Sequence, residues 1–260
     1  METDAVLTLL KDVAEEVINP RFRALAAEEI HEKNPGDLVT IADRESEALI
    51  TEALHRAYPD ALVLGEEATA ADAALLDGFR SADHAFTVDP VDGTKNFVKG
   101  SIDHAVMVAE LHGPEVVRSW IWQPQHERAY VAERGAGAWC NGERLVRPPI
   151  GEGLRGVTSR GKWIGRALGA FQALEVTWVC CGVDYPKVVE GSADYALYRR
   201  AKPWDHAPGQ LLLTEAGGFV GTFDGSPYRP QGEPPFGLIT AADRATYDVV
   251  QGLVHALPGL

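Results

Sequence analysis

Cysteine is scarce in this chain of 260 residues, which contains only Cys140, Cys180 and Cys181. An odd number of cysteines, two of them adjacent, fits neither a disulfide framework nor a spaced metal-ligand motif, so we expect a reducing, cytoplasmic location. Long apolar runs are missing too, because no stretch approaches the ~18 continuous apolar residues of a membrane span. Residues 1–20 have no basic start and no unbroken apolar run, so we expect neither a signal peptide nor a membrane partner.

Basic residues are also few. The chain has 24 Lys and Arg against 38 Asp and Glu, a formal charge of −14. Nucleic-acid polymers and anionic membranes are bound through basic surfaces, so a small molecule is the expected partner. The length and the 45% of hydrophobic residues predict a folded chain with one large domain or two closely packed halves.

The order of apolar residues predicts a mixed α and β protein. Helical spacing indicates helices over 7–18 and 46–57, with a turn and a short strand-like piece between them over 31–43. The remaining expected elements are short strands over 61–64 and 85–88, an antiparallel meander over 104–111, 115–124 and 126–135, and then strand 174–182, helix 204–216, strand 235–242 and helix 243–257. We expect one unit, 1–260, of class α+β or α/β, with an α+β half over 1–147 that carries the metal and catalytic motifs and an α/β half over 148–260.

Carboxylates follow two of the short apolar runs. Glu66 comes after the run 61–64, and the segment Asp-Pro-Val-Asp-Gly-Thr, residues 89–94, comes after 85–88. Carboxylates held together repel one another unless a cation compensates, and hard oxygen ligands suit Mg²⁺. Pro90 stiffens its turn, and Gly93 allows backbone N–H groups to approach an anion. Asp-Pro and Asp-Gly are also ordinary turn formers, so either segment alone is ambiguous.

Asp205 lies at the start of the predicted helix 204–216. Two interpretations stay open for it. It is a helix N-cap, or it directs its carboxylate at a metal beyond the helix end.

The motifs together resemble the inositol monophosphatase family, which comprises Mg²⁺-dependent, lithium-sensitive phosphatases. Four segments occur in the family's order and cover most of the chain: Asp37-Leu38-Val39-Thr40-Ile41-Ala42-Asp43, Gly65-Glu66-Glu67, Asp89-Pro90-Val91-Asp92-Gly93-Thr94, and Trp204-Asp205-His206-Ala207-Pro208-Gly209 followed by Glu215-Ala216-Gly217-Gly218. The resemblance implies a layered α-β-α-β-α sandwich, a homodimer, and two or three Mg²⁺ ions as cofactor.

The resemblance also assigns roles to residues. Glu66, Asp89 and the Val91 carbonyl would hold one Mg²⁺, and Asp89, Asp92 and Asp205 the other. The catalytic residues would be Asp43, Thr94 and Glu66, with Asp43 hydrogen-bonded to Thr94 and Thr94 orienting a metal-activated water. Phosphate would be bound by Gly93, Thr94, Asp92 and Asp205.

Substrate specificity is where the sequence departs from the family pattern. The family's inositol-specific members carry a Glu seven residues before the Trp-Asp aspartate, and this chain has Tyr198 there, followed by Arg199 and Arg200. The two arginines would recognise a second phosphate or simply face solvent. Lys33 resembles a flexible basic residue near the family's metals, and an exposed loop lysine is the competing interpretation.

The predicted activity is hydrolysis of a small phosphate monoester, similar to inositol 1-phosphate, by in-line attack of water. The alternatives are a histidinol phosphatase, a 3′(2′),5′-bisphosphate nucleotidase and a fructose-1,6-bisphosphatase. A different class of function is a metal-binding regulatory protein without activity. Asp43 and Thr94 speak against that class, because metal binding alone does not require them.

Overall fold

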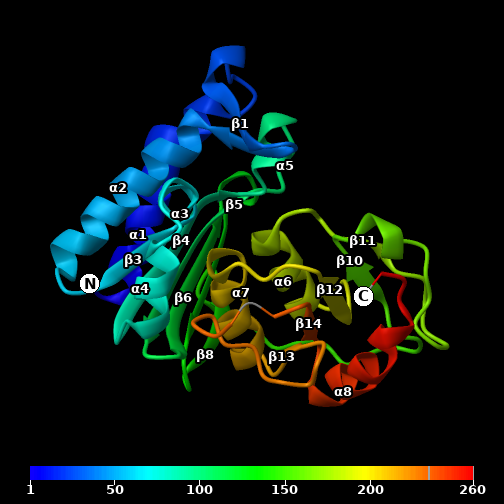
Figure 1. Ribbon diagram of the computed structural model, residues 1–260. Coiled ribbons are helices and arrows are strands. Elements are labelled where there is room, and N and C mark those ends of the chain that lie inside the picture. The colour runs from blue at the N-terminus through cyan, green and yellow to red at the C-terminus, as the bar shows by residue number, and fades with distance from the viewer. Residues whose placement is uncertain (234, 260) are drawn as a thin grey trace.

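Five alternating layers of helices and sheets make up the fold in this computed structural model, which describes residues 1–233 and 235–259 (Figure 1). The predicted α-β-α-β-α sandwich is confirmed. The helices are α1 (Thr3–Val13), α2 (Ile41–Ala57), α3 (Glu66–Ala71), α4 (Leu75–Ser81), α5 (Thr94–Val98), α6 (Cys181–Val189), α7 (Pro203–Glu215) and α8 (Arg244–Leu253). Within the described residues, none of these helices is both long and apolar enough to cross a membrane.

A seven-stranded sheet is the larger of the two β layers. In spatial order it contains β3 (Leu62–Gly65), β4 (His84–Asp92), β5 (Ala105–His112), β6 (Glu115–Gln123), β7 (Arg128–Glu133), β8 (Gly137–Cys140) and β9 (Glu143–Arg144). Only the β3–β4 pair of this sheet is parallel. Parallel β3 and β4 therefore end at the same edge, and the acidic motifs that follow or close them are neighbours.

The five-stranded sheet forms the second β layer. It contains β11 (Glu175–Val176), β10 (Gly156–Thr158), β12 (Tyr195–Tyr198), β14 (Leu238–Ala241) and β13 (Phe219–Thr222) in spatial order. A separate hairpin of β1 (Ile30–Asn34) and β2 (Asp37–Thr40) leads into α2 and stands at the top of the view in Figure 1.

Buried apolar residues hold the layers together. Leu10 of α1 and Ile50 of α2 pack with Phe86 and Trp120 on the outer face of the large sheet. Helices α6 and α7 fill the space between the two sheets, and their apolar residues join both sheets in one core. Tyr247 of α8 packs on the outer face of the small sheet. Burial on both faces explains why α7 is apolar almost all round.

Most predicted elements are confirmed. The first predicted helix is α1, continued by a π-helical turn at Ala14–Ile18, and the second is α2. The predicted meander is β5, β6 and β7, the later helices are α7 and α8, and the run 235–242 contains β14.

Two predictions were wrong in part. Segment 174–182 is mainly a loop, because only Glu175–Val176 pairs as a strand and α6 begins at Cys181. The side chain of Asp184 in α6 accepts the backbone N–H of Trp178 at 2.8 Å, so this part of the run is bonded to a helix and not to a strand. Segment 31–43 contains a whole hairpin. Its first strand is polar and largely exposed, so a search for apolar alternation does not detect it.

Candidate active site and metal centre

A β-bulge in β4 brings two of the predicted carboxylates to one side of the strand. Side chains three residues apart on a regular strand point to opposite faces. Between Asp89 and Asp92, however, the register with β5 shifts: Asp89 pairs with Met107 and Asp92 with Ala105, so β4 contains one residue more than its partner. Pro90 lies in this bulge and has no N–H for the ladder. The extra residue turns Asp92 to the side of Asp89.

Three carboxylates from separate elements meet beside this bulge. Carboxylate oxygens of Glu66, Asp89 and Asp205 lie within 4.8 Å of one another. Glu66 is the first residue of α3, Asp89 belongs to β4, and Asp205 lies in the first turn of α7. Of the two interpretations of Asp205, the N-cap is wrong. Lys202 occupies that position and Pro203 begins the helix, so the carboxylate of Asp205 is left to face the other two.

Electrostatics at this cluster favour a bound cation. Burial, and after it the charges of neighbouring carboxylates, raise the pKa values of both Asp89 and Asp205 well above their ordinary range. Asp89 is 1% exposed, and its Oδ1 atom has no hydrogen-bond partner among residues 1–233 and 235–259. A buried carboxylate oxygen without a donor is strongly unfavourable. The oxygen-only donor set fits Mg²⁺, whose charge would offset this repulsion.

Asp92 is partly committed to another helix. Its Oδ2 accepts hydrogen bonds from the backbone N–H of Gly182, at 2.5 Å, and from the thiol of Cys180, at 2.9 Å. Burial raises the pKa of Asp92 to about 6, although these donors oppose the increase. The residue nevertheless lines the same 150 Å³ cavity as Glu66, Asp89, Val91 and Asp205. All five predicted metal ligands therefore surround one space.

The predicted contact between Asp43 and Thr94 is present. The Thr94 hydroxyl lies 3.0 Å from Oδ1 of Asp43, and 3.1 Å from the Val91 carbonyl as a second acceptor. The other oxygen of Asp43 accepts the backbone N–H of Thr40 at 2.8 Å and its hydroxyl at 2.5 Å, in a capping box at the start of α2. Burial raises the pKa of Asp43 to about 7, against the effect of the Thr40 bonds.

Gly93 connects the metal cluster to Thr94. Its φ of +81° is in the left-handed region, and a Cβ there would lie 3.0 Å from both the Asp103 carbonyl and the Cys180 side chain. A side chain at this position would be strained and crowded at the same time. The tight turn starts α5 directly beside the carboxylates, where its first backbone N–H groups can approach an anion.

Lys33 reaches the cluster from the hairpin. Its Nζ donates to Glu66 at 2.8 Å and to Glu67 at 2.7 Å. Burial alone would lower the pKa of Lys33, but these two carboxylates outweigh it and raise that pKa above its ordinary value. Lys33 is therefore not a solvated loop residue. It places a positive charge beside Glu66.

A wider cleft adjoins the metal cluster on the side of the small sheet. This cavity of 350 Å³ is lined by Tyr198, Arg199 and Arg200, and also by Asp92 and Asp205. Tyr198 is buried and donates its hydroxyl to Asp184 at 3.1 Å. Arg199 donates to the Phe236 carbonyl at 2.6 Å and lies over the ring of that residue. The contacts with Phe236 therefore occupy part of the hydrogen-bonding capacity of the Arg199 guanidinium group.

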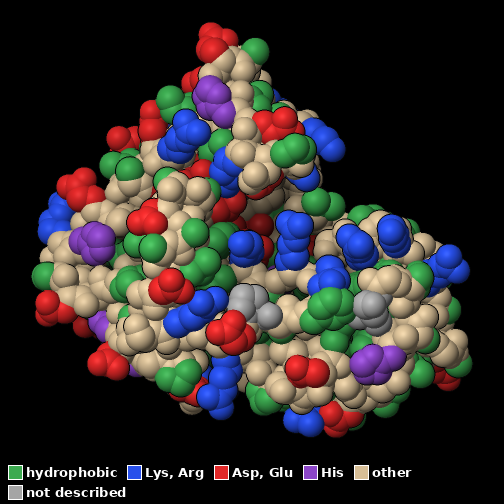
Figure 2. All heavy atoms as spheres, in the orientation of Figure 1, with side chains coloured by type: hydrophobic (Ala, Val, Ile, Leu, Met, Phe, Trp, Pro, Cys, Tyr) green, Lys and Arg blue, Asp and Glu red, His purple; other side chains and the backbone are tan. Residues whose placement is uncertain are grey.

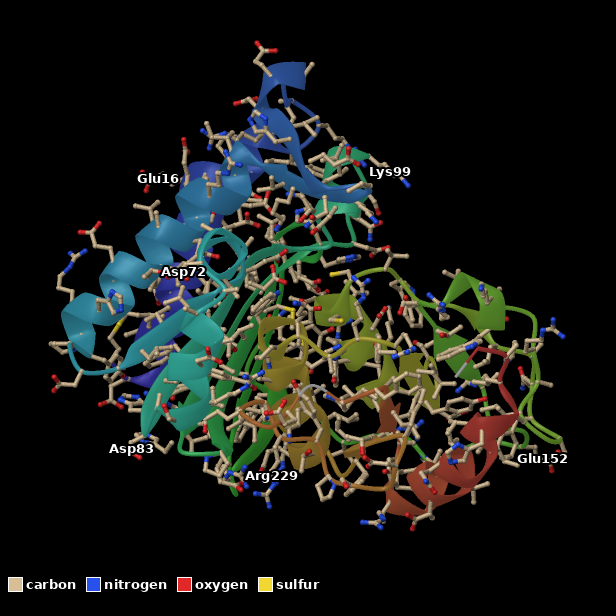
Figure 3. All side chains as sticks on the ribbon, viewed as in Figure 1. Glu16, Asp72, Asp83, Lys99, Glu152 and Arg229 are labelled. Atoms are coloured by element: carbon tan, nitrogen blue, oxygen red, sulfur yellow. The ribbon has the colours of Figure 1, made fainter. Side chains whose placement is uncertain are left out.

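Figure 2 shows the hollow that contains these cavities, with acidic side chains at its depth and Lys and Arg side chains along its edge. Arg200 is exposed and lines both the 350 Å³ cleft and a neighbouring cleft of 630 Å³. The larger cleft is also lined by Lys33, Lys95 and Lys202. Asp72 and Lys99, which are labelled in Figure 3, directly follow the short helices α3 and α5.

Comparisons with known proteins agree with this geometry. The sequence profile of the inositol monophosphatase family matches residues 2–256. The chain belongs to the inositol monophosphatase family. A fructose-1,6-bisphosphatase/inositol-1-monophosphatase of Aquifex aeolicus is 31% identical over 250 residues, which span 90% of this chain and 88% of that protein. The Nus factor SuhB of Pseudomonas aeruginosa is 30% identical over 228 residues, 82% of each chain.

A solved structure of the family has the same fold. The crystal structure of an IMPase/NADP phosphatase complexed with Mg²⁺ and phosphate matches with a TM-score of 0.80 and 22% identity, over 98% of this chain and 95% of that one. Members of the inositol monophosphatase family are phosphatases, and this chain is a phosphatase of that family.

Two residues of the site, Glu47 and Arg160, were not predicted from the sequence. Glu47 of α2 accepts the backbone N–H groups of Glu67 and Ala68, both at 2.7 Å, and so holds the first turn of α3. A Cβ on Gly65 would lie 2.3 Å from this carboxylate, which explains the glycine of the family's Gly-Glu-Glu motif here. The spacing of Asp43 and Glu47, four residues apart on one helix face, was the only available signal.

Arg160 is the second missed residue. It lines the 350 Å³ cleft with Arg200, and its buried Nε has no hydrogen-bond partner in the described part of the chain. Nothing in the local sequence around Arg160 distinguishes it from a surface arginine. Its role at the cleft follows only from the position of β10 next to β12.

Proposed function

We propose that this chain is a Mg²⁺-dependent phosphomonoesterase that hydrolyses a small phosphate monoester similar in size to inositol 1-phosphate. The observation that carries the proposal is the cluster of Glu66, Asp89 and Asp205 with its orphaned Asp89 oxygen. Glu66, Asp89 and the Val91 carbonyl would hold one ion, and Asp89, Asp92 and Asp205 another. The number of ions, two or three, is part of the proposal.

The bound ions would lower the pKa of a water molecule and neutralise charge on the phosphoryl group. The protein's part is positioning. With its hydrogen donated to Asp43, the Thr94 oxygen presents a lone pair to a water and accepts a hydrogen bond from it. Asp43, whose pKa is raised to about 7, receives the proton that Thr94 relays. The water then attacks phosphorus in line with the departing alkoxide.

The phosphate would lie at the start of α5. The turn at Gly93 leaves the N–H groups of Gly93 and Thr94 beside the carboxylate cluster, where they can donate to phosphoryl oxygens as charge develops on them. The alkoxide would leave toward the 350 Å³ cleft, which adjoins Asp92 and Asp205. No covalent phosphoenzyme is needed in this arrangement.

The 350 Å³ cleft favours an alternative substrate with two anionic groups. Arg160 and Arg200 both line it, and Tyr198 stands where inositol-specific members carry an acid. Two guanidinium groups can donate several hydrogen bonds to the oxygens of one phosphate group. The second candidate substrate is therefore a bisphosphate nucleotide, NADP or a sugar bisphosphate. Histidinol phosphate stays a third. The names of the Aquifex aeolicus and NADP phosphatase relatives support a broad range of substrates.

Phosphate release from a substrate panel tests the activity. The panel contains inositol 1-phosphate, histidinol phosphate, adenosine 3′,5′-bisphosphate, fructose 1,6-bisphosphate and NADP, each with Mg²⁺, with EDTA, and with Mg²⁺ plus Li⁺. We expect release that requires Mg²⁺ and that Li⁺ inhibits. The Asp89→Asn variant, purified by the same procedure, shows how much of the release comes from a contaminating phosphatase. No release from any substrate would favour a regulatory protein, the function that the printed name of the Pseudomonas aeruginosa relative suggests.

Substitution of the two arginines tests the substrate class. If the substrate has a second phosphate, Arg160→Gln and Arg200→Gln each raise KM for bisphosphates by about tenfold, or ~1.4 kcal/mol of binding, and leave KM for inositol 1-phosphate unchanged. Arg166→Gln, at an exposed position outside the cleft, is the matched control. Equal KM changes for all substrates would remove the bisphosphate alternative.

A further inference from the structure

A second group of metal-ligating side chains lies at the opposite end of β4 from the catalytic motif. His84 begins β4, and Glu110 and His112 end β5, which is antiparallel to it. In the register of the two strands His84 pairs with His112 and Phe86 with Glu110. His84 and Asp89 are five residues apart on one strand, roughly 17 Å at about 3.3 Å per residue. The labelled Asp83 in Figure 3 precedes β4 at this remote corner.

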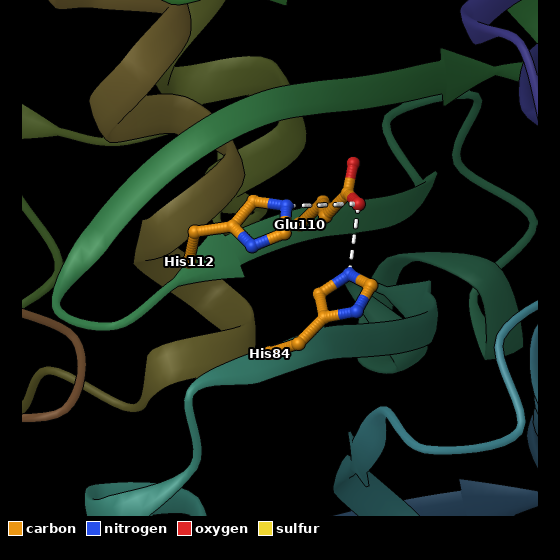
Figure 4. A group of neighbouring side chains, drawn as sticks. All are labelled: His84, Glu110 and His112. Carbon is orange, nitrogen blue, oxygen red and sulfur yellow. Dashed lines mark hydrogen bonds and ion pairs between the residues drawn. The ribbon is translucent and has the colours of Figure 1, made fainter.

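The three side chains converge on one point, as Figure 4 shows. Nε2 of His84 lies 2.8 Å and Nε2 of His112 lies 3.7 Å from the same Glu110 oxygen, Oε1. One ligand atom from each residue lies within 4.8 Å of the other two. Two ligands bound to Zn²⁺ in tetrahedral geometry, with bonds of about 2.0–2.1 Å, are about 3.3 Å apart. The two observed separations lie on either side of that value, so small side-chain rotations suffice to admit the ion.

Neighbouring residues orient the carboxylate toward the imidazoles. Arg118 binds the other oxygen of Glu110, Oε2, and also donates to the Tyr58 hydroxyl at 3.0 Å. Oε1 is left for the two histidines. Burial would raise the pKa of Glu110, but the bonds from Arg118 and His84 outweigh it and lower that pKa, so the carboxylate is ionised. A carboxylate held in this way is a pre-oriented ligand.

The imidazoles are held as well, and the group is open to solvent. The rings of His84 and His112 stack with centroids 4.4 Å apart, and the Tyr58 ring packs edge-on against His84. These ring contacts hold both imidazoles beside the Glu110 carboxylate. The side chain of His112 is 58% exposed, and that of His84 is 24% exposed. An ion can therefore reach the group and keep water as its fourth ligand.

We propose that His84, Glu110 and His112 form a binding site for a divalent transition-metal ion, Zn²⁺ in the first instance, separate from the catalytic centre. Two imidazoles and one carboxylate are a donor set that Zn²⁺ favours and Mg²⁺ does not. The ion would link the ends of β4 and β5 and stabilise the folded chain, because the site does not exist in the unfolded one.

Binding of Zn²⁺ and Co²⁺ in the presence of excess Mg²⁺ tests the site. Titration calorimetry should find one equivalent of Zn²⁺ bound by the wild type, and Co²⁺ should give the visible absorption of a four-coordinate ion. His112→Gln should weaken binding of both ions at least about tenfold, because one of three protein ligands is lost, and should abolish the Zn²⁺-induced rise in Tm. His112 is exposed, so this substitution leaves the core intact. His255→Gln, at another exposed histidine, is the matched control.

Three results overturn the proposal: no equivalent bound beyond the catalytic centre, equal binding by His112→Gln and the wild type, or a Co²⁺ spectrum of purely octahedral type. Asp89→Asn separates the two centres. This variant should still bind one equivalent of Zn²⁺ and show the Co²⁺ absorption. Loss of both signals would mean that the ion binds to the catalytic carboxylates. Lowering the pH from 7.5 to 5.5 should weaken binding, because the histidines must lose a proton to bind.

Discussion

The hydroxyl of Thr94 has a single hydrogen and two acceptors within reach, Asp43 at 3.0 Å and the Val91 carbonyl at 3.1 Å. Only the bond to Asp43 gives the hydrogen a route to a group that can take up a proton. Asp43 is also the third helical residue of a capping box, so its orientation is set by Thr40 before any substrate binds. The proposed catalytic role would therefore coexist with a structural role in one carboxylate.

Thr94→Ala is predicted to lower kcat about 10²-fold or more while changing KM little, because the hydroxyl acts on the attacking water and not on the bound ester. Steady-state kinetics with the best substrate of the panel measures both constants. Thr94→Ser keeps the hydroxyl and should retain most of the activity. A parallel rise of KM in Thr94→Ala, with kcat unchanged, would contradict the assigned role.

Asp89→Asn is predicted to have opposite effects on activity and on the stability of the metal-free protein. Phosphate release should fall to background, because both of the proposed ions would lose a ligand. The free energy of unfolding in EDTA stays the same or rises, since a buried charge beside Glu66 and Asp205 is removed. Chemical denaturation in EDTA and in Mg²⁺ measures this, with the exposed Asp12→Asn as control. Clear destabilisation in EDTA would show that Asp89 supports the fold without metal.

At the scale of elements, the site depends on how three helices begin. Helices α3, α5 and α7 begin at Glu66, Thr94 and Pro203, and each directs its first turn at the carboxylate cluster. Glu47 of α2 binds two N–H groups of the α3 turn and so determines where Glu66 lies. Positioning of a metal ligand by a neighbouring helix commonly changes metal affinity by 10 to 100-fold.

Glu47→Ala should therefore weaken the enzyme's use of Mg²⁺. We expect the Mg²⁺ concentration for half-maximal activity to rise about tenfold and the free energy of unfolding to fall by about 2 kcal/mol, since two backbone N–H groups lose their acceptor. Mg²⁺ titration of activity and urea denaturation measure the two effects. Glu52→Ala, at an exposed position of the same helix that pairs with Arg56, is the control. An unchanged Mg²⁺ requirement would mean that α3 needs no support from α2.

Motifs that are continuous in sequence were predicted well, and contacts between distant segments were predicted only where the family resemblance supplied them, as for Asp43 and Thr94. Residues 89–94 form their corner locally, through Pro90 and the turn at Gly93, so the sequence pattern contains the geometry. Glu47 meets α3 only because α2 packs beside that helix, and Arg160 reaches the cleft only because β10 pairs with β12. Tertiary contacts of this kind cannot be recognised from the spacing of residues within one segment of the sequence. The roles given to the site residues stay predictions until the variants are measured.

At the scale of the whole molecule, two expectations from the sequence stay untested. The resemblance predicts a homodimer, which light scattering coupled to size-exclusion chromatography would detect as twice the mass of the 28.1 kDa chain. The division near residue 148 is also a proposal. The large sheet is built from residues 62–144 and the small sheet from 156–241, but α6 and α7 share one core with both sheets. A shared core favours unfolding in one cooperative transition.

Titration of the buried carboxylates predicts how stability depends on pH and on Mg²⁺. Burial raises the pKa values of Asp43 and Glu47 to about 7 and that of Asp89 well above the ordinary range. Carboxylates of the unfolded chain titrate near 4, so the folded state binds more protons between those values. Stability from these groups is present at low pH and is lost as pH rises through 7. Below about pH 6.5 the buried His104 and His206, with pKa values lowered to about 4, act in the opposite direction.

The metal-free protein is therefore predicted to lose stability from pH 6.5 to pH 8. Histidines of the unfolded chain, with an ordinary pKa of about 6.5, finish losing their protons in the lower part of this range, and the carboxylates with raised pKa values titrate across it. If Mg²⁺ binds the ionised carboxylates as proposed, its stabilising effect should grow over the same range, toward the ~2.7 kcal/mol expected at 100 times its Kd. Thermal unfolding in EDTA and in Mg²⁺ at pH 6.5, 7.2 and 8 measures both trends. A Tm in EDTA that rises with pH would mean that the carboxylates of the site are ionised without metal, and that a positive group such as Lys33 suffices to hold them together.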